Sequence, residues 1–223
     1  MNTKIIDHHM HTNYSPDADQ KATFKAYIKQ AELHQIEALV FTDHVDFDST
    51  ADIFLDMIDY DAYIKDLKLA QKDTTVDLRL GVEIGYQPHL NDRLHRFLSD
   101  YPFDFVICSI HNGDGKDFYE GSFFVGKTQE EAYRRYFEIV LETVKSYDNY
   151  DVFGHIDYII RYGGYDLKMY RYETYKDIID DILKVIIQKG KGIEINTSGL
   201  RYGLGVLHPL LDVLKSYKML GGT

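Results

Sequence analysis

Cysteine and tryptophan are scarce in this chain, since its 223 residues include one cysteine, Cys108, and no tryptophan. A single cysteine excludes a disulfide within the chain and any zinc site built from several thiolates, so His and carboxylate side chains remain as metal ligands. No apolar run reaches the roughly 18 residues that a membrane helix needs. Residues 1–11 include Asp7 and three histidines where a secretory signal would be apolar, so we expect a cytoplasmic protein with no membrane partner.

Basic side chains are also in the minority. Lys and Arg number 25 against 36 Asp and Glu, which gives a net charge of -11. A protein that binds nucleic acid normally presents positive charge to the phosphate backbone. We therefore expect no nucleic-acid partner, although a local pair of Arg residues can still bind one small phosphate group.

Short β-type runs alternate with helical runs along the whole chain, and no Pro- or Ser-rich linker divides it. The pattern predicts one α/β domain over residues 1–223, with a parallel sheet and helices outside it. Six β-then-α units favour a barrel of the TIM kind, although six units are few for closure. The expected strands are 4–7, 38–42, 77–84, 105–109, 152–154 and 191–195, and the expected helices are 23–35, 59–72, 89–99, 128–144, 174–190 and a last one between Pro209 and Gly221.

Two of the helix starts carry a capping signature. Thr128 is followed three residues later by Glu131, and Thr174 is followed at the same spacing by Asp177. Gly190 is suited to end the second of these helices, because glycine readily adopts the left-handed conformation of a C-terminal cap.

Metal-binding side chains recur where the expected strands end, which is the catalytic face of a βα barrel. His9 and His11 are two residues apart on an extended segment, so they point to the same side. Asp17 lies in the following loop and can fold back over them. The remaining candidates at the strand ends are His44, Glu83, His111 and His155.

These candidate ligands are more than one metal ion coordinates. Imidazole and carboxylate without thiolate suit Zn, Mn or Fe, so we expect two or three divalent ions of this kind. A hydroxide bridging them, held by Glu83 and the histidine ligands, would be the catalytic nucleophile for attack on phosphorus.

Residues near the ligands supply phosphate contacts and support. Arg161 and Arg201 each precede Tyr-Gly a few residues beyond a strand end, and they suit bidentate phosphate recognition, with Ser198 and Asn196 as neutral donors. Ligating imidazoles commonly donate their other N–H to a nearby acceptor. That supporting role is expected for Asp7, Asp43, Asp157 and Asn196. His208 reads as an ordinary loop histidine.

The ordered motifs resemble those of the polymerase and histidinol phosphatase (PHP) family, in particular its monofunctional histidinol-phosphatase branch. The resembling segments are Asp-His-His-Met-His at 7–11, Thr-Asp-His-Val-Asp-Phe at 42–47, Gly-Val-Glu-Ile-Gly at 81–85, Ser-Ile-His at 109–111, Phe-Gly-His-Ile-Asp-Tyr at 153–158 and Glu-Ile-Asn-Thr-Ser-Gly-Leu-Arg at 194–201. The resemblance implies a distorted (β/α)7 barrel with a trinuclear centre. Its ions would be held by His9, His11 and Glu83, by Asp17 and His44, and by Glu83, His111 and His155, with Arg161 and Arg201 on the substrate phosphate.

The family's last motif, Asp-x-His on a seventh strand, does not follow Gly221 and Gly222. Relative to that pattern the seventh unit is absent and the chain looks C-terminally truncated. Two ions would each lose a ligand, so we expect reduced or absent activity. The first and sixth strands would be open edges that invite self-association.

The function implied is metal-dependent hydrolysis of L-histidinol phosphate to L-histidinol and phosphate, a step of histidine biosynthesis. One alternative is another PHP phosphoesterase, acting on a different small phosphate ester or on nucleic-acid ends. The other is an inactive metal-binding fragment. The charge of -11 and the lack of a basic stripe argue against the nucleic-acid form.

Overall fold

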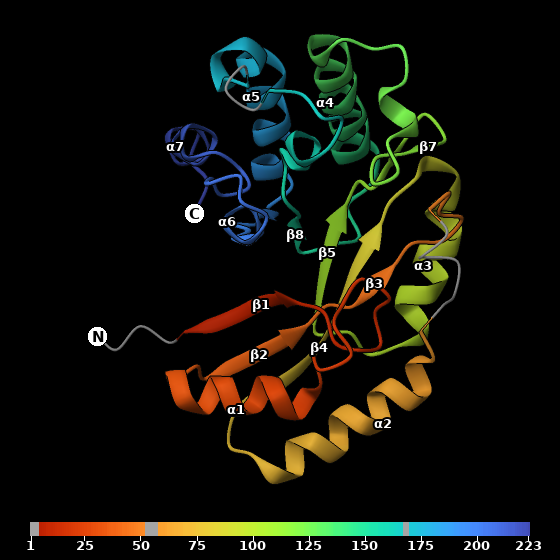
Figure 1. Cartoon of the computed structure of the whole chain (residues 1–223), viewed down its shortest axis with the longest axis vertical. Helices are drawn as coiled ribbons and strands as arrows, with labels where there is room; N and C mark the ends of the chain where they lie inside the picture. Colours follow the sequence, from red (N-terminus) through yellow and green to blue (C-terminus); the bar gives the residue numbers. More distant parts are fainter. Residues whose placement is uncertain (1–4, 52–57, 167–169) are drawn as a thin grey trace.

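The computed structural model describes residues 5–51, 58–166 and 170–223, which form a curled parallel β-sheet with helices packed around it (Figure 1). Lys4, the first residue of an expected strand, lies outside these ranges. Neighbouring strands pair in parallel in the order β1 (Ile6–Met10), β2 (Ala38–Phe41), β4 (Asp77–Gly85), β5 (Phe105–Ser109), β8 (Val152–Phe153) and β9 (Gly192–Ile193).

The sheet is a half-barrel. Within the described ranges β1 and β9 are its two edges, as expected for the first and sixth strands, and their backbones are not paired with each other. The sheet is therefore curled rather than closed, as the small number of βα units suggested. Its curl still brings the two edges near each other, because the His9 side chain on β1 contacts that of Glu194, just after β9.

Helices surround the curled sheet. Figure 1 shows α1 next to β2 and α2 farther along, next to β4, while α4, α5 and α7 gather next to β5 and β8 at the top of the view. Within the described ranges short 3-10 turns accompany the helices: η2 (Gln71–Asp73), η3 (Pro88–Leu90), η4 (Ser122–Phe124) and η5 (Tyr158–Arg161). The α-helices are α1 (Phe24–His34), α2 (Tyr60–Ala70), α3 (Asn91–Asp100), α4 (Gln129–Ser146), α5 (Tyr172–Gln188), α6 (Ser198–Arg201) and α7 (Leu211–Met219).

One of the two expected helix caps forms. Thr128 and Glu131 make the reciprocal hydrogen bonds of a capping box at α4. Helix α5 instead begins at Tyr172, so Thr174 lies inside its first turn. Asp177 is then well inside the helix, too far from its start to close a capping box, and its carboxylate accepts two hydrogen bonds from Arg134 of α4, at 2.9 and 2.8 Å. Gly190 follows α5 with a φ of 67°, as expected for a C-terminal cap.

Two short elements were not expected. The short β3 (His44–Val45) follows β2 and pairs with β4, so the expected strand 38–42 is followed by a second segment. A hairpin of β6 (Asn112–Gly113) and β7 (Lys116–Asp117) turns at Asp114-Gly115, a sequence typical of hairpin turns.

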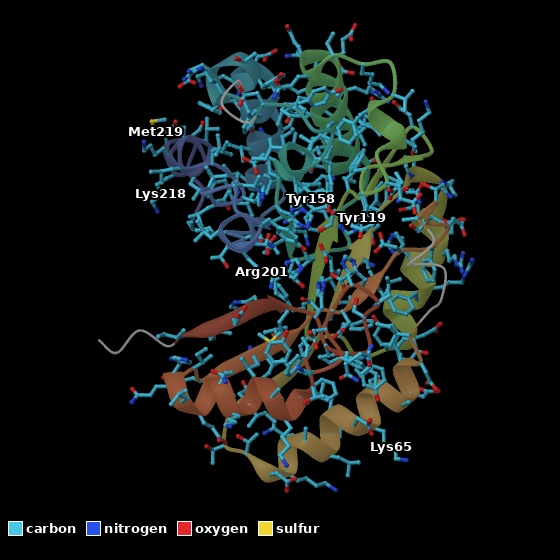
Figure 2. All side chains as sticks on the ribbon, in the orientation of Figure 1. Lys65, Tyr119, Tyr158, Arg201, Lys218 and Met219 are labelled. Atoms are coloured by element: carbon cyan, nitrogen blue, oxygen red, sulfur yellow. The ribbon has the colours of Figure 1, made fainter. Side chains whose placement is uncertain are left out.

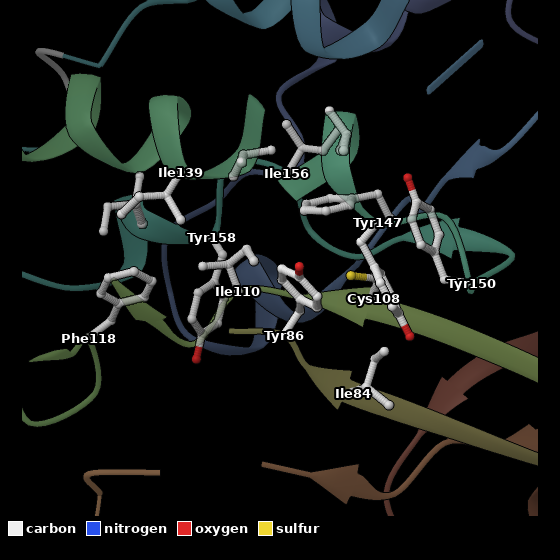
Figure 3. Packing of buried hydrophobic residues seen from close by; sticks show 14 of the residues in the cluster. Ile84, Tyr86, Cys108, Ile110, Phe118, Ile139, Tyr147, Tyr150, Ile156 and Tyr158 are labelled. Carbon is white, nitrogen blue, oxygen red and sulfur yellow. The ribbon is translucent and has the colours of Figure 1, made fainter. Parts of the chain in front are cut away.

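The core fills the space between the sheet and the helices. Figure 3 shows Ile84 of β4 and Cys108 of β5 close to Tyr86, Tyr147 and Ile110. All five are buried. Burying each such side chain contributes about 1.5–3 kcal/mol to the free energy of unfolding, which keeps the strand ends in fixed positions. No helix in the described ranges is both long enough and apolar enough to cross a membrane.

Candidate metal centre

Glu83 lies at the centre of the polar residues that gather at the strand ends. Its side chain is 1% exposed. The Ser109 hydroxyl donates to Glu83 Oε1 at 2.6 Å, and His155 Nε2 lies 2.9 Å from the same oxygen. Glu83 Oε2 lies 3.1 Å from the Nε2 atoms of both His9 and His11.

The other predicted ligands surround this carboxylate. His44 Nδ1 lies 3.4 Å from Glu83 Oε2, and His111 Nε2 lies 3.4 Å from Glu83 Oε1. Asp17 folds back from its loop, with Oδ2 at 2.9 Å from His11 Nδ1 and 3.6 Å from His44 Nε2. All seven side chains are thus brought together. Three overlapping groups place their ligand atoms within 4.8 Å of one another: His9, His11 and Glu83; His11, Asp17 and His44; and His44, Glu83 and His111.

These residues fit divalent cations. Zinc–nitrogen bonds of about 2.0–2.1 Å place tetrahedral ligand atoms about 3.3 Å apart. The Nε2 atoms of His9 and His11 are 3.0 Å apart, and each is 3.1 Å from Glu83 Oε2. Nitrogen and carboxylate donors without sulfur suit Zn, Mn or Fe.

The carboxylates and imidazoles of this cluster shift one another's pKa values. Burial alone would raise the pKa of Glu83, but the imidazoles of His9 and His44 hold it well below its usual value. Burial would likewise lower the pKa of His9 and His44, yet the surrounding carboxylates raise both well above 6.5. The pKa of His111 rises to about 9 despite its burial, chiefly because of Asp46. At His155 burial outweighs the attraction of the Glu83 carboxylate, and the pKa falls to about 4.

Asp46 supports two of the imidazoles and was missed by the sequence analysis. Its oxygens lie 2.7 Å from His111 Nδ1 and 2.9 Å from His44 Nδ1. The signal was present in the sequence, because Asp46 stands two residues after His44 and alternate residues of an extended segment share a side. Gly85 leaves the space that Asp46 fills, since a Cβ there would overlap Asp46 Oδ1 and lie 2.7 Å from its Cγ.

Replacing Gly85 by alanine should therefore displace Asp46. We expect Gly85→Ala to weaken metal binding by about 10- to 100-fold, as for other losses of a supporting carboxylate. We also expect it to lower the free energy of unfolding of the metal-free protein by about 1–3 kcal/mol. Metal titration and chemical denaturation measure the two effects.

The same substitution in an Asp46→Ala background is the control. There the added methyl group meets no carboxylate, so its cost in unfolding free energy should largely disappear. Equal costs in the two backgrounds would contradict the steric explanation.

Glu194 is a second supporting carboxylate without a predicted role. Glu194 Oε1 lies 2.5 Å from His9 Nδ1, and Oε2 accepts a hydrogen bond from the His155 backbone N at 2.8 Å. The imidazoles of His9 and His155 hold its pKa at about 2 although burial would raise it. Asn196 Nδ2 donates to Glu194 Oε1 at 2.9 Å and lies 3.4 Å from His9 Nδ1.

The three aspartates expected behind the imidazoles have other partners. Asp43 accepts hydrogen bonds from the Tyr63 hydroxyl and from the backbone N and hydroxyl of Thr12. As the neighbour of His44 in an extended segment, it points to the opposite side. Exposed Asp7 accepts from the backbone N of His9 rather than from its ring.

Asp157 pairs with His208, which was expected to be an ordinary loop histidine. His208 is completely buried, and its Nδ1 lies 2.9 Å from Asp157 Oδ1. The other Asp157 oxygen accepts from the Leu210 backbone N at 2.8 Å. His208 also pairs with Asn196 through both backbone groups. Asp157 therefore ties the segment that follows α6 to the His155 segment instead of orienting the His155 ring.

The two predicted phosphate-binding arginines have different surroundings. Arg161 is half-buried and donates from Nη2 to the Ser198 hydroxyl at 2.5 Å. Its guanidinium lies 4.8 Å from the Tyr158 ring and 4.4 Å from the Tyr202 ring. Arg201 is exposed, with its guanidinium 5.6 Å from the Tyr202 ring. In the described part of the chain neither has a carboxylate within 4.0 Å, so both keep positive charge available for an anion.

Comparison with known proteins places these observations in a family. The family model described as "PHP domain" matches residues 7–198. The chain is 33% identical to a histidinol-phosphatase of Lactococcus lactis subsp. lactis, over 98% of this chain and 81% of the relative. It is 31% identical to a probable histidinol-phosphatase of Clostridium acetobutylicum, over 98% of this chain and 82% of the relative.

Solved structures agree. The histidinol phosphate phosphatase of Lactococcus lactis, complexed with zinc, L-histidinol and phosphate, superposes with a TM-score of 0.89 at 30% identity, covering 98% of this chain and 82% of that one. A structure of a protein from Listeria monocytogenes has a TM-score of 0.79 at 20% identity, over 96% of this chain and 91% of that one, and shares the fold.

Proposed function

The chain belongs to the PHP domain family, and from this premise we propose that it is a metal-dependent phosphatase that hydrolyses L-histidinol phosphate to L-histidinol and phosphate. The proposed ligands are those the sequence suggested. His9, His11 and Glu83 would hold one ion, Asp17 and His44 a second, and Glu83, His111 and His155 a third. The substrate phosphate would lie against Arg161, Arg201 and Ser198.

The position of Tyr158 between a histidine and an arginine carries the proposal. The Tyr158 ring stacks on the His155 ring, with a centroid distance of 4.3 Å and an interplanar angle of 26°. The Arg161 guanidinium lies 4.8 Å from the Tyr158 centroid and 4.4 Å from that of Tyr202. A side chain suited to phosphate is thus one aromatic ring away from an imidazole that contacts Glu83. This arrangement allows a phosphate monoester to reach the metal ligands and an arginine together.

The residues of the chain have separable tasks in this proposal. Divalent ions, when bound, would supply a water acidic enough to attack phosphorus and positive charge for the phosphoryl oxygens. Arg161 and Arg201 donate hydrogen bonds to those oxygens and neutralise their charge. Ser198 fixes the Arg161 guanidinium. Asp46 and Glu194 hold the imidazole rings in the orientation that ligation requires.

The direct test measures phosphate release from L-histidinol phosphate by the purified chain with added Mn or Zn, together with elemental analysis of bound metal. We expect saturable release that depends on added metal and stops with a chelator. Bound metal at full occupancy without release of phosphate would contradict the proposed reaction while leaving the metal site intact.

Metal binding should also release protons. Nearby carboxylates raise the pKa of His9 and His44 well above 6.5 and that of His111 to about 9, which favours protonated rings in the metal-free protein. An imidazolium must lose a proton before it can ligate a metal. We therefore expect a net release of protons at pH 7, measured as the slope of calorimetric binding enthalpy against buffer ionisation enthalpy.

Two histidine variants make this measurement specific. His111→Asn should lower the number of released protons by about one, because it removes a ring that is protonated before binding. His34→Asn, which changes an exposed ring at the end of α1, should leave the slope unchanged. A slope of zero in the unmodified protein would contradict protonated ligands.

A further inference from the structure

His208 is a buried histidine outside both the metal centre and the proposed phosphate contacts. Its side chain and that of Asp157 are 0% exposed, with His208 Nδ1 at 2.9 Å from one Asp157 oxygen. The His208 Nε2 atom has no hydrogen-bond partner among the described residues, so the contact with Asp157 is the ring's one polar contact there. Burying an imidazole costs free energy that an apolar side chain of the same size would not cost. The place of this single bond therefore needs an explanation.

Two segments carry the proposed phosphate contacts. Residues 155–162 include Arg161, and residues 194–210 include Arg201. Figure 2 shows Tyr158 of the first segment and Arg201 of the second, both in the central part of the molecule. Phosphate binding by both segments requires that they keep a fixed position relative to each other.

Contacts of two kinds join these segments. Between half-buried side chains, Arg161 Nη2 donates to the Ser198 hydroxyl at 2.5 Å. In the interior, His208 contacts Asp157. A contact at one point allows the segments to rotate about it, whereas a second contact some residues away prevents that rotation.

His208 also supports the start of α6. Its backbone and that of Asn196 exchange two hydrogen bonds, at 2.7 and 2.9 Å. Asn196 Oδ1 accepts a further hydrogen bond from the Ser198 backbone N at 2.9 Å. A Cβ on Gly199 would lie 3.2 Å from His208 Nε2, so the backbone of α6 lies directly against the ring. Ser198 is thereby fixed from below by His208.

Asp157 determines where Arg161 begins. Asp157 directly precedes the 3-10 turn η5, and Arg161 is the last residue of that turn. A guanidinium gives phosphate two parallel hydrogen bonds only when its plane is correctly placed, and ordering a mobile side chain on binding costs free energy. Holding Asp157 in place therefore makes phosphate binding at Arg161 less costly.

We propose that His208 is a positioning residue for phosphate binding: by holding Asp157, it keeps the Arg161 guanidinium and the Ser198 hydroxyl in place for the phosphoryl oxygens. This inference rests on the proposed phosphatase function and adds to it a residue that acts through others without touching the substrate. Coupling between two sites is reciprocal, so phosphate bound at Arg161 must in turn stabilise the contact of Asp157 with His208.

The first test measures the dissociation constant of inorganic phosphate by calorimetry, with the zinc-loaded protein freed of excess zinc. We expect His208→Leu to raise this constant roughly three- to tenfold, the cost of ordering one side chain again. In an Arg161→Ala background the same substitution should have almost no further effect, because the residue through which it acts is gone. Equal increases in the two backgrounds would show a general loss of structure and would overturn the proposal.

Two further variants separate the hydrogen bond from packing. His208→Asn should keep most of the phosphate affinity, since its amide nitrogen can take the place of Nδ1. A loss as large as in His208→Leu would contradict the role of the bond. Ser216→Ala is the matched control, because it removes another buried donor to a carboxylate, Asp180 Oδ1 at 2.6 Å, between α7 and α5. It should leave the phosphate dissociation constant unchanged.

Hydrogen exchange tests the reciprocal effect with His208 intact, so it decides the proposal even where His208→Leu does not fold. The Leu210 backbone N donates to the second Asp157 oxygen at 2.8 Å, so its exchange reports on this contact. Inorganic phosphate should slow that exchange in the unmodified protein but not in Arg161→Ala. Absence of slowing in the unmodified protein would overturn the proposal.

Failure of this inference and failure of the proposed function give different results. If phosphate binding depends on His208 as described but L-histidinol phosphate is not hydrolysed, the reaction is contradicted and the positioning role stands. If the ester is hydrolysed, KM should rise in His208→Leu together with the phosphate dissociation constant, while kcat changes little. Hydrolysis with both constants unchanged would leave the function standing and overturn the positioning role. A zinc-loaded protein that binds no phosphate would contradict both.

Discussion

Replacing Glu83 with glutamine is expected to empty the metal site and to lower the rate of L-histidinol phosphate hydrolysis by roughly a thousandfold. Removing one partner of a buried charged group costs about 3–5 kcal/mol, and 1.36 kcal/mol corresponds to a factor of ten in rate. Glu83 is the partner of several imidazoles at once, with His9 and His11 at 3.1 Å and His155 at 2.9 Å.

Glutamine keeps the shape of the side chain and an oxygen that can accept the Ser109 hydrogen bond, so the effect isolates the charge. Elemental analysis of the purified variant measures bound metal, and phosphate release measures activity. Glu142→Gln, an exposed position on α4, is the matched control and should change neither. Full metal content in Glu83→Gln would show that another group binds the ions, and would contradict the central position given to this carboxylate.

Most of the fold was accessible from the sequence because hydrophobic periodicity determines which elements form. The run 105–109 is the strand found as β5, and the spacing from Thr128 to Val144 predicted α4 with its capping box. Periodicity does not determine the residue at which a helix begins. Thr174 and Asp177 had the right spacing for a cap, but α5 begins at Tyr172, so both residues lie inside the helix. The open edges at the first and sixth strands were expected as well, because six βα units are few for a closed barrel.

The candidate site also has a part that the sequence predicted and a part that it did not. Residues at strand ends could be predicted, because the carboxyl ends of parallel strands meet on one face, and the seven proposed ligands do gather there. The carboxylates that orient the ligand imidazoles could not be predicted from their closeness to the histidines in the sequence. Asp43 is adjacent to His44 but lies on the other side of the segment, while Asp46 contacts the ring. Asp157 was a fair candidate until His208, 51 residues away, proved to be its partner.

Arg161→Ala should lower kcat/KM for L-histidinol phosphate by roughly a hundredfold, mainly through a higher KM, while bound metal is retained. Each hydrogen bond to a charged group contributes about 1.5–3 kcal/mol, and the guanidinium offers two in the geometry that phosphate accepts. Arg161 is already oriented for that contact by the Ser198 hydroxyl and by the rings of Tyr158 and Tyr202. Little orientational entropy is therefore lost when phosphate binds.

Lysine at position 161 should recover only part of this loss, because an ammonium group provides charge without the planar pair of donors and without stacking on both rings. Inhibition by inorganic phosphate supplies a second measurement, and its constant should rise in parallel with KM in Arg161→Ala. Arg79→Ala removes an exposed arginine paired with Asp77 on β4 and should alter neither value. If Arg161→Lys matched the unmodified protein, charge alone would account for binding, and the stacked, bidentate role assigned to this arginine would be wrong.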